Sequence, residues 1–418
     1  MWDLLLRRLE RGNEMNGKKQ FWKGIAAGFV LTLILVEAAV AGGKWLEERK
    51  KTASETSRAE LTDERIDEKL EEIETLINTY YLDEIDSEQV ESYLYKGAVA
   101  GLGDLYSAYY TQEEYQSLLE STNGSYCGIG VEITQSMTTG VVSVTRVFEG
   151  TPAMEAGLLP GDKIYQIGGR EATGEDLTKI VTWIKGEEHT TVTVSVLREG
   201  EDDYLELEVE RRIIEVPTVE YEMLENQIGY IALSGFEDVT ANQFLQALDA
   251  LENQGMEALI VDLRNNGGGL VSCVCTILDR LLPEGLIVYT EDKYGQREEL
   301  FSDAEHFFDK PLAVLVNENS ASASEIFAGA IKDYGIGTLV GTTTYGKGIV
   351  QKIYPLKDGT AVKLTVSKYY TPNGKNIHGI GIEPDVEVEL EEELKKETVI
   401  PKEEDNQLQK AVEILKMK

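Results

Sequence analysis

Two apolar runs that each lead into a helix restrict the fold more than any other feature of this chain. Residues 311–316 form one such run and predict a buried strand, and residues 326–333 after it have the apolar spacing of a helix. Residues 258–262, which are apolar up to Asp262, predict the second strand, and a glycine-rich turn after it opens another helix. Strands and helices alternate in this way from 216 to 388, which predicts an α/β core.

Three serines, Ser320, Ser322 and Ser324, lie where the first run meets its helix. A hydroxyl at such a junction is close to unpaired backbone N–H groups and to the positive end of the helix dipole. That environment suits an attacking alkoxide and the oxyanion that it creates. Lys347 lies between two glycines further along the chain, and it can serve as a base only where burial keeps it neutral. These residues are candidates for a Ser/Lys pair.

Composition limits the classes of partner and cofactor. The chain has 418 residues, enough for two or three domains, and its 42% hydrophobic content supports packed cores. The formal charge of -35 argues against a nucleic-acid partner, because phosphate binding needs a basic surface. The three cysteines and three histidines form no cluster with metal-ligand spacing, so we expect neither a metal nor a cofactor.

The amino terminus has the pattern of an exported protein. A basic segment, 1–23, precedes an apolar run, 24–43, whose length of about 20 residues is enough to cross a bilayer. Positive charge before the span places the amino end in the cytoplasm and the remainder of the chain outside the cell membrane. We expect an uncleaved, single-pass signal-anchor. Ala39-Val-Ala41 also resembles a signal-peptidase site, so a cleaved, secreted form is the alternative.

The remaining chain divides by its periodicity. Apolar spacing predicts helices near residues 66–81 and up to residue 99, whose tyrosine-rich face suits either internal packing or dimerisation. Alternation with period two then predicts short strands, with two helices near 152–156 and 174–184. The predicted parts are a linker (44–62), a helical segment (63–120), a strand-rich domain (121–212), the α/β core (213–390) and an acidic carboxyl-terminal segment with a terminal helix (391–418).

The strand-rich part resembles a PDZ domain. Gly128, Ile129, Gly130 and Val131 resemble the loop with which such domains bind a peptide's terminal carboxylate. Residues 150–162, with Pro-Ala, Ala-Gly-Leu and Gly-Asp in order, resemble the helix and turn that follow. Glycine-flanked N–H groups can hold a terminal carboxylate while the peptide adds to the sheet as a strand.

From about residue 66 to 415, the chain resembles the C-terminal processing peptidases, which are serine proteases with a PDZ domain and a Ser/Lys site. Besides the PDZ segment, the resemblance rests on blocks at 103–109, 262–269, 320–325, 346–348 and 371–385. It implies an extracytoplasmic endopeptidase that cleaves the free carboxyl-terminal tails of proteins, with the PDZ domain binding the tail and gating the site. Dimerisation is common in the relatives, and the sequence leaves any regulatory partner open.

The resemblance also implies individual roles. Ser322 matches the nucleophile, Lys347 the general base, and Gln351 the residue that orients the lysine. The residues themselves leave Ser320 and Ser324 open as nucleophiles, although a helix-capping role suits one of them better.

The backbone N–H of Ala323, with that of Gly268 or Gly269, is implied to form the oxyanion hole. Many relatives have another residue, often proline, where this chain has Gly267. We therefore expect a looser turn, and a hole that is less fully formed without substrate.

Three other readings compete with this one. A Ser/His/Asp triad would need His189, His306 or His378, of which the last belongs to a family block and suits a structural hydrogen bond better. A catalytically silent PDZ adaptor or scaffold in the cell envelope would leave Ser322, Lys347 and Gln351 unexplained. A thioesterase or hydratase on a related core would give the PDZ segment and the membrane anchor no purpose.

Overall fold

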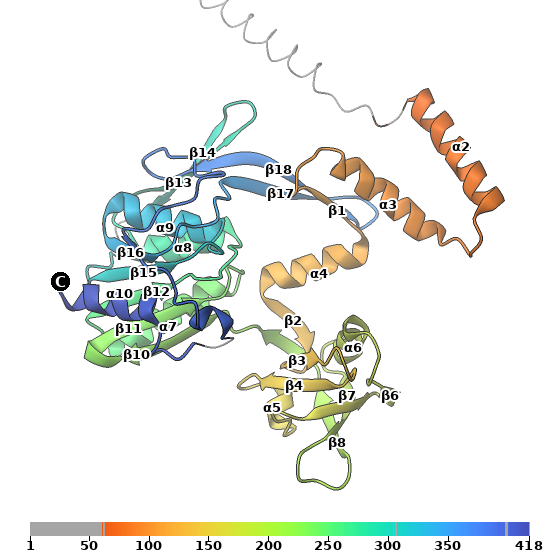
Figure 1. Ribbon diagram of the computed structural model, residues 1–418, viewed down its shortest axis with the longest axis horizontal. Coiled ribbons are helices and arrows are strands. Elements are labelled where there is room, and N and C mark those ends of the chain that lie inside the picture. Colours follow the sequence, from red (N-terminus) through yellow and green to blue (C-terminus); the bar gives the residue numbers. More distant parts are fainter. Residues whose placement is uncertain (1–60, 62, 304, 306, 398–399, 418) are drawn as a thin grey trace, which may run out of the picture. The chain divides into compact units, whose positions relative to one another are not determined.

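The computed structural model describes residues 61, 63–303, 305, 307–397 and 400–417 (Figure 1). The predicted basic segment, the membrane span at 24–43 and almost all of the linker lie outside these residues. Within the described part, no helix combines the length and the apolar character that a membrane span requires. The chain divides into two compact units, Met1–Asp86 and Ser87–Lys418.

In the first unit the described helix is α2 (Glu64–Tyr80). The Asp63 carboxylate caps it by accepting a hydrogen bond from the N–H of Ile66 at 2.8 Å. The helix confirms the amphipathic stripe that the sequence predicts. None of its residues is buried, so its apolar face stays exposed within the described part of this unit.

The second unit starts with helix α3 (Ser87–Ala100), strand β1 (Ala108–Tyr110) and helix α4 (Gln112–Asn123). Thr111 and Glu114 form a capping box at the start of α4, and Gly124 ends the helix in the left-handed conformation. These local signals fix the direction in which the chain enters the next module.

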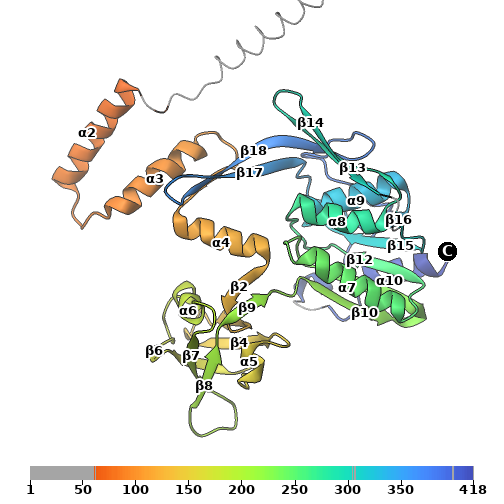
Figure 2. The same ribbon diagram turned by 180° about the vertical axis from the view of Figure 1, so that it is seen from behind.

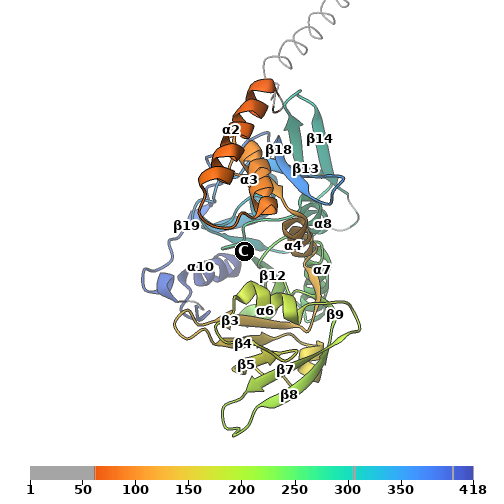
Figure 3. The same cartoon turned by 90° about the vertical axis from the view of Figure 1, so that its right-hand side faces the viewer.

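An antiparallel module follows, and the chain enters and leaves it through a two-stranded ribbon. Strand β2 (Ser125–Gly128) pairs with β9 (Arg212–Glu215). Between them, β3, β4, β5, β7 and β8 lie side by side in this order (Figure 3). Strand β6 pairs with β5. Alternating apolar residues of these strands fill the module's own core. The elements are β3 (Val131–Gln135), β4 (Val142–Val147), α5 (Pro152–Glu155), β5 (Lys163–Ile167), β6 (Arg170–Glu171), α6 (Leu177–Ile184), β7 (Thr191–Leu197) and β8 (Leu205–Glu210).

The α/β core is built on a sheet with the order β10-β11-β12-β15-β16-β19. Strand β10 is antiparallel to β11, and the remaining pairs are parallel. Its strands are β10 (Val219–Leu224), β11 (Ile228–Leu233), β12 (Ala258–Asp262), β15 (Leu312–Val316), β16 (Gly337–Gly341) and β19 (Val386–Glu387). Its helices are α7 (Thr240–Asn253), α8 (Val271–Leu281), α9 (Ala323–Tyr334) and α10 (Asn406–Lys416), with short 3-10 helices at Glu225–Gln227 and Leu394–Lys396.

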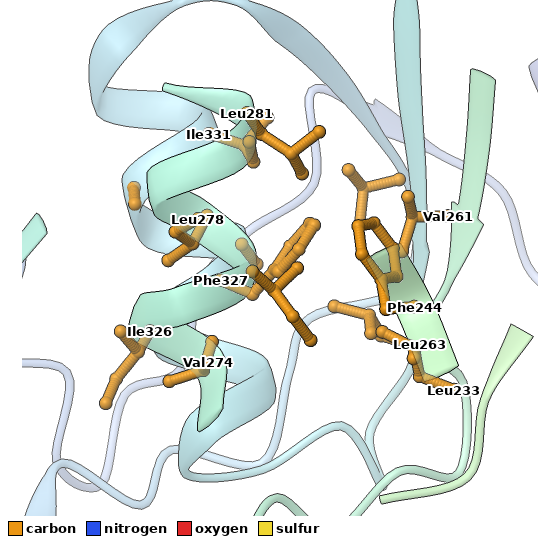
Figure 4. Close-up of a cluster of buried hydrophobic side chains, with 14 of the residues drawn as sticks. Leu233, Phe244, Val261, Leu263, Val274, Leu278, Leu281, Ile326, Phe327 and Ile331 are labelled. Atoms are coloured by element: carbon orange, nitrogen blue, oxygen red, sulfur yellow. The ribbon is translucent and has the colours of Figure 1, made fainter. Parts of the chain in front are cut away.

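Both faces of this sheet are covered, which explains the continuous apolar runs at 258–262 and 311–316. Helices α7, α8 and α9 pack on one face, where Val261 and Leu263 meet Phe244, Phe327 and their neighbours (Figures 2 and 4). The alternate residues of the same strands face α10. Because β12 and β15 are parallel neighbours, their carboxyl ends lie at the same edge of the sheet, and the loops after both strands start there.

A second sheet carries the segment around Lys347 and has the order β1-β18-β13-β14, with β17 also paired to β18. Its strands from the core are β13 (Gly285–Asp292), β14 (Arg297–Ser302), β17 (Ile349–Pro355) and β18 (Ala361–Tyr370). Strand β18 pairs with both β17 and β1, so that Lys363 lies opposite Ala108.

The structure joins parts of two predicted segments to the α/β core. Strand β1, from the predicted helical segment 63–120, belongs to a sheet of the core because its backbone pairs with β18. Helix α10, from the predicted carboxyl-terminal segment 391–418, also belongs to the core, since Leu408 and Ala411 are buried against the sheet. Contacts over such sequence separations leave no mark on local periodicity.

Candidate active site

Ser322 is the residue that precedes α9, and its backbone is strained. Its φ of 55° and ψ of -112° are rare for a residue with a side chain, and the side chain is half-buried. The N–H of Ser322 donates to Glu325 Oε2 at 2.9 Å, and its carbonyl accepts a hydrogen bond from the Tyr369 hydroxyl at 3.0 Å. A sharp, strained strand-to-helix turn is the backbone form that exposes the nucleophilic serine of α/β-hydrolases.

The neighbouring serines are committed to buried hydrogen bonds. Ser320 Oγ donates to the carbonyl of Leu263 at 2.7 Å, and Ser324 Oγ donates to the carbonyl of Asn266 at 2.9 Å. Both side chains are fully buried. Neither serine caps α9, since the N-cap residue is Ser322 itself, so the expectation of a cap at Ser320 or Ser324 is wrong.

The buried Glu325 carboxylate connects two segments: the turn around Ser322, called the serine turn, and the loop around Lys347, called the lysine loop. Its Oε2 accepts hydrogen bonds from the N–H groups of Ser322 at 2.9 Å and Lys347 at 2.8 Å. Its Oε1 accepts from the Thr344 hydroxyl at 2.6 Å and from the N–H of Gly346 at 2.7 Å. This role of Glu325 is not among those predicted from the sequence. A glutamate three residues after a serine has capping-box spacing, which was the available signal.

Lys347 is half-buried between this carboxylate and the second sheet. Burial lowers the pKa of its ammonium group, and the positive charge of Lys363 lowers it further. Asp104 and Glu325 act to raise it, but the net direction is downward. Among the hydrogen bonds of the described residues, none joins Lys347 Nζ to Ser322 Oγ.

Gln351 lies on β17, close after the lysine loop. Its side-chain amide donates to the Thr365 hydroxyl at 3.3 Å on the neighbouring strand β18. The described contacts therefore pair Gln351 with Thr365 rather than with Lys347.

The glycine turn after β12 lies directly against the serine turn. A Cβ atom at Gly268 would come within 2.6 Å of the Ala321 carbonyl oxygen and 2.7 Å of Ser322 Cβ. The N–H of Gly268 donates to the Asn266 side chain at 2.8 Å and is therefore occupied. Gly269 lies opposite Phe236 in a parallel bridge, whose hydrogen bonds run from the Phe236 N–H to the Gly268 carbonyl at 3.0 Å and from the Leu270 N–H to the Phe236 carbonyl at 2.7 Å. The N–H of Gly269 itself donates to no partner among the described residues. Ala323 starts α9, and its N–H has no carbonyl within the helix to reach.

This turn allows a matched pair of substitutions. Gly268→Ala is expected to lower kcat/KM by about 10²-fold, because the new methyl group displaces the Ser322 turn and Gly268 has a φ of 100°. Gly267→Ala is the control, since nothing lies within 4 Å of a Cβ at that position. Steady-state kinetics with a peptide substrate measure both. Equal losses in the two variants would show that close contact at Gly268 does not matter.

The PDZ-like module contains a groove of about 290 Å³ between β3 and α6. Its apolar lining includes Ile129, Val131, Val181 and Ile184, so two of the four residues predicted for the carboxylate loop line it. Lys185, at the end of α6, also lines the groove and forms an ion pair with Glu120 of α4 at 2.6 Å. The groove fits an extended apolar segment beside a positive charge.

No histidine with a described position makes a hydrogen bond to Ser322. His189 pairs with Glu210 in the PDZ-like module at 3.0 Å, and His306 lies outside the described residues. The exposed His378 lies beside Gly348, and its backbone N–H donates to Asn376 at 3.3 Å. The contacts of the described histidines give a Ser/His/Asp triad no support.

Comparisons with known proteins match both modules. The sequence model of peptidase family S41 matches residues 227–388, and that of a PDZ domain matches residues 143–198. The chain is 34% identical over 337 residues to the carboxy-terminal processing protease CtpB of Bacillus subtilis (strain 168), covering 80% of this chain and 70% of that protein. It is 33% identical over 359 residues to the carboxy-terminal processing protease CtpA of the same strain, covering 86% and 76%.

Solved structures give a further match. A photosystem II D1 C-terminal processing protease is 31% identical to this chain, with a TM-score of 0.45 and coverage of 75% of this chain and 86% of that one.

Proposed function

The chain belongs to peptidase family S41 and is a serine peptidase, and on this premise we propose that it cleaves carboxyl-terminal tails of proteins through an acyl-enzyme on Ser322 with Lys347 as base. One observation carries the proposal. The buried Glu325 carboxylate holds the backbone N–H groups of both residues, which brings the two loops to one site. The relatives CtpB and CtpA are carboxy-terminal processing proteases by name.

The proposed reaction has two halves. Neutral Lys347 takes the proton of the Ser322 hydroxyl while the oxygen attacks the peptide carbonyl. The C–N bond then breaks, and the amine leaves with the proton that the lysine held. Water hydrolyses the resulting ester in the same manner, which releases the new carboxyl terminus and restores the serine. Burial of Lys347 and the charge of Lys363 support this role, because both favour the neutral amine.

The N–H of Ala323 and one from the glycine turn are proposed to bind the oxyanion. The N–H of Gly268 donates to the Asn266 side chain, so it can bind the oxyanion only after this hydrogen bond breaks. If Gly268 is the donor, this observation supports a hole that is not fully formed at rest, whereas the N–H of Gly269 makes no described hydrogen bond and would need no such change. In the same way, the pairing of Gln351 with Thr365 supports a resting state in which Gln351 has yet to orient the lysine.

Replacement of either proposed catalytic residue tests the proposal. In the purified full-length chain, Ser322→Ala and Lys347→Ala are expected to reduce tail cleavage of a peptide by about 10⁴-fold or more. The half-buried Ser136 of the PDZ-like module and the exposed Lys352 provide matched controls, Ser136→Ala and Lys352→Ala, which are expected to keep wild-type rates. Cleavage that continues undiminished in Ser322→Ala would overturn the protease mechanism, and peptide binding without any wild-type cleavage would favour the adaptor.

The PDZ-like module is proposed to bind the substrate's tail and to gate the site. The apolar groove beside Lys185 supports recognition of an apolar last residue with a free carboxylate. The ion pair of Lys185 with Glu120 supports gating, because a carboxylate in the groove competes with Glu120 for the lysine.

Blocking the terminal carboxylate tests this recognition. Amidating the last residue of a peptide substrate is expected to raise KM by about 10-fold, since a charge-assisted hydrogen bond is lost. Val181→Lys puts a charge into the apolar groove. It is expected to weaken the binding of peptides with a free carboxyl terminus and so to raise their KM. Identical kinetics for free and amidated tails would contradict the proposed recognition.

The apolar run at 24–43 supports an uncleaved membrane anchor with the peptidase outside the cytoplasm. Fractionation of cells that express the full chain tests this proposal. A full-length chain in the membrane fraction supports an anchor, and a truncated chain in the soluble extracytoplasmic fraction supports cleavage near Ala41 instead. Dimerisation through the amino-terminal helices is likewise proposed, and sedimentation of the full chain measures it.

A further inference from the structure

An aromatic ring from the amino-terminal part of the second unit covers the lysine of the proposed active site. Lys347 Nζ lies 4.6 Å from the centroid of the Tyr106 ring. Tyr106 is half-buried in the loop between α3 and β1, far from Lys347 in the sequence. A cation this close to an aromatic face is attracted by the negative charge density of the ring.

The loop that carries Tyr106 is fixed from both sides. The Asp104 carboxylate accepts hydrogen bonds from the N–H of Tyr106 at 3.1 Å and from the Ser107 hydroxyl at 2.5 Å. Ser107 Oγ in turn accepts a hydrogen bond from the N–H of Thr365 at 3.1 Å. Thr365 is also the residue to which Gln351 donates, so one position of β18 holds both the loop and the proposed orienting residue.

The hydroxyl end of Tyr106 is held as well. It forms a hydrogen bond with the side chain of Tyr345, which lies two residues before the lysine, and this bond together with burial raises the pKa of Tyr106. The raised pKa favours the neutral phenol, so the group that lies against the lysine is an uncharged ring.

The ring is one of several groups that act on Lys347 from different elements. Lys363 of β18 is positive and favours the neutral amine, whereas Asp104 of the loop and Glu325 of α9 are acidic and favour the ammonium. The ring of Tyr106 adds to the second group, because only the charged form of the lysine is attracted to it. The ring also excludes water from one side of the lysine. Any buried side chain of similar size would have this second effect.

We propose that Tyr106 is a positioning residue for the peptidase reaction, which holds the resting Lys347 ammonium on its ring face and so opposes formation of the neutral base. This inference rests on the proposed role of Lys347 and gives a role to Tyr106 of the 103–109 block, for which the resemblance implies no individual role. The loop at 103–107 thereby becomes part of the active site. Its aromatic side chain sets the pH at which the lysine becomes able to accept a proton.

Substitutions that separate the ring's charge distribution from its bulk test the inference. Tyr106→Leu keeps an apolar cover without the aromatic face, so the acid limb of the kcat/KM profile is expected to move to lower pH by about 0.5 to 1.5 units. On that limb, kcat/KM at fixed pH rises about 3- to 30-fold. Tyr106→Phe keeps the face and is expected to leave the limb in place. Tyr106→Ala admits water, which stabilises the ammonium, and is expected to move the limb upward.

Tyr93 provides the matched control. Tyr93 is exposed and also lies in the amino-terminal part of the second unit, and the centroid of its ring is 5.5 Å from Lys96 Nζ. Tyr93→Leu is expected to leave the pH profile unchanged. Thermal unfolding of the full chain checks that each variant is folded, and Tyr106→Met replaces the leucine variant if that one is not. The opposite shifts in the leucine and alanine variants distinguish positioning from a purely structural role.

An unchanged acid limb in a folded Tyr106→Leu or Tyr106→Met variant would overturn the inference, as would shifts of the same sign in the apolar and alanine variants. Lys347→Ala separates this failure from that of the proposed function. If Lys347→Ala retains full activity, the lysine is not the base and the proposed mechanism itself fails. If it is inactive while the Tyr106 variants keep the wild-type profile, only the role of Tyr106 fails.

Discussion

Glu325→Gln is expected to lower kcat/KM for tail cleavage by about 10²-fold or more, although Glu325 touches neither reacting atom. Four donors converge on its two oxygens: the N–H groups of Ser322, Gly346 and Lys347 and the hydroxyl of Thr344. A glutamine has one carbonyl oxygen, so its NH₂ group must face two of these donors. The serine turn and the lysine loop then separate, and misplacement of about 1 Å costs this much in rate.

Steady-state kinetics and thermal unfolding of the same preparation measure the two consequences. Buried donors without an acceptor are expected to destabilise the variant by about 1–3 kcal/mol each. Glu318→Gln is the matched control, because Glu318 lies nearby on the surface and accepts one hydrogen bond, from Thr342 at 2.9 Å. A Glu325→Gln enzyme with the activity of the Glu318→Gln control would refute the claim that this carboxylate joins the two loops.

Arg264→Met is expected to destabilise the folded chain by about 3–5 kcal/mol, because it leaves buried carboxylates without their counter-ion. Arg264 follows β12 and bridges Asp262 at 2.6 Å and Asp405 at 2.7 Å, with a further bond to Gln407 at 3.0 Å. Burial works to lower the pKa of Arg264, but the two carboxylates raise it overall, so the guanidinium stays charged. The arginine thus connects the start of α10 to the end of β12, which precedes the glycine turn.

Urea unfolding of the full chain measures this loss. Arg146→Met is the control, since Arg146 pairs with Glu220 at 3.1 Å with both side chains largely exposed, and surface pairs contribute about 0–1 kcal/mol. We expect kcat/KM of the folded fraction of Arg264→Met to fall as well, because the glycine turn follows Arg264 directly. Equal unfolding free energies in the two variants would contradict the structural role of this network.

Local patterns predict the main elements of the core well. The apolar run at 258–262 coincides with β12, and the run at 311–316 differs from β15 by one residue. Both are strands with two covered faces, for which a continuous apolar run is the expected signal. Helix α9 starts at Ala323, earlier than the apolar spacing from Ile326 indicates, because its first turn is fixed by Glu325 and not by packing alone.

The parts that the sequence does not predict depend on contacts between distant segments. Strand β1 is three residues long and has no pattern of its own, so only its pairing with β18 identifies it. The same holds for the ring of Tyr106 over Lys347 and for the tie between Arg264 and Asp405. The motif residues Ser322 and Lys347 could be proposed from sequence, whereas the carboxylate that connects their loops required the fold.

Covalent labelling of the nucleophile tests the central claim most directly. The full-length chain is treated with a fluorophosphonate in the presence of a free-carboxyl peptide, and the modified residue is located by peptide mass spectrometry. The account predicts one adduct, on Ser322, which is absent in Ser322→Ala and strongly slowed in Lys347→Ala. An adduct on another serine, or equal labelling of the Ser322→Ala chain, would contradict it.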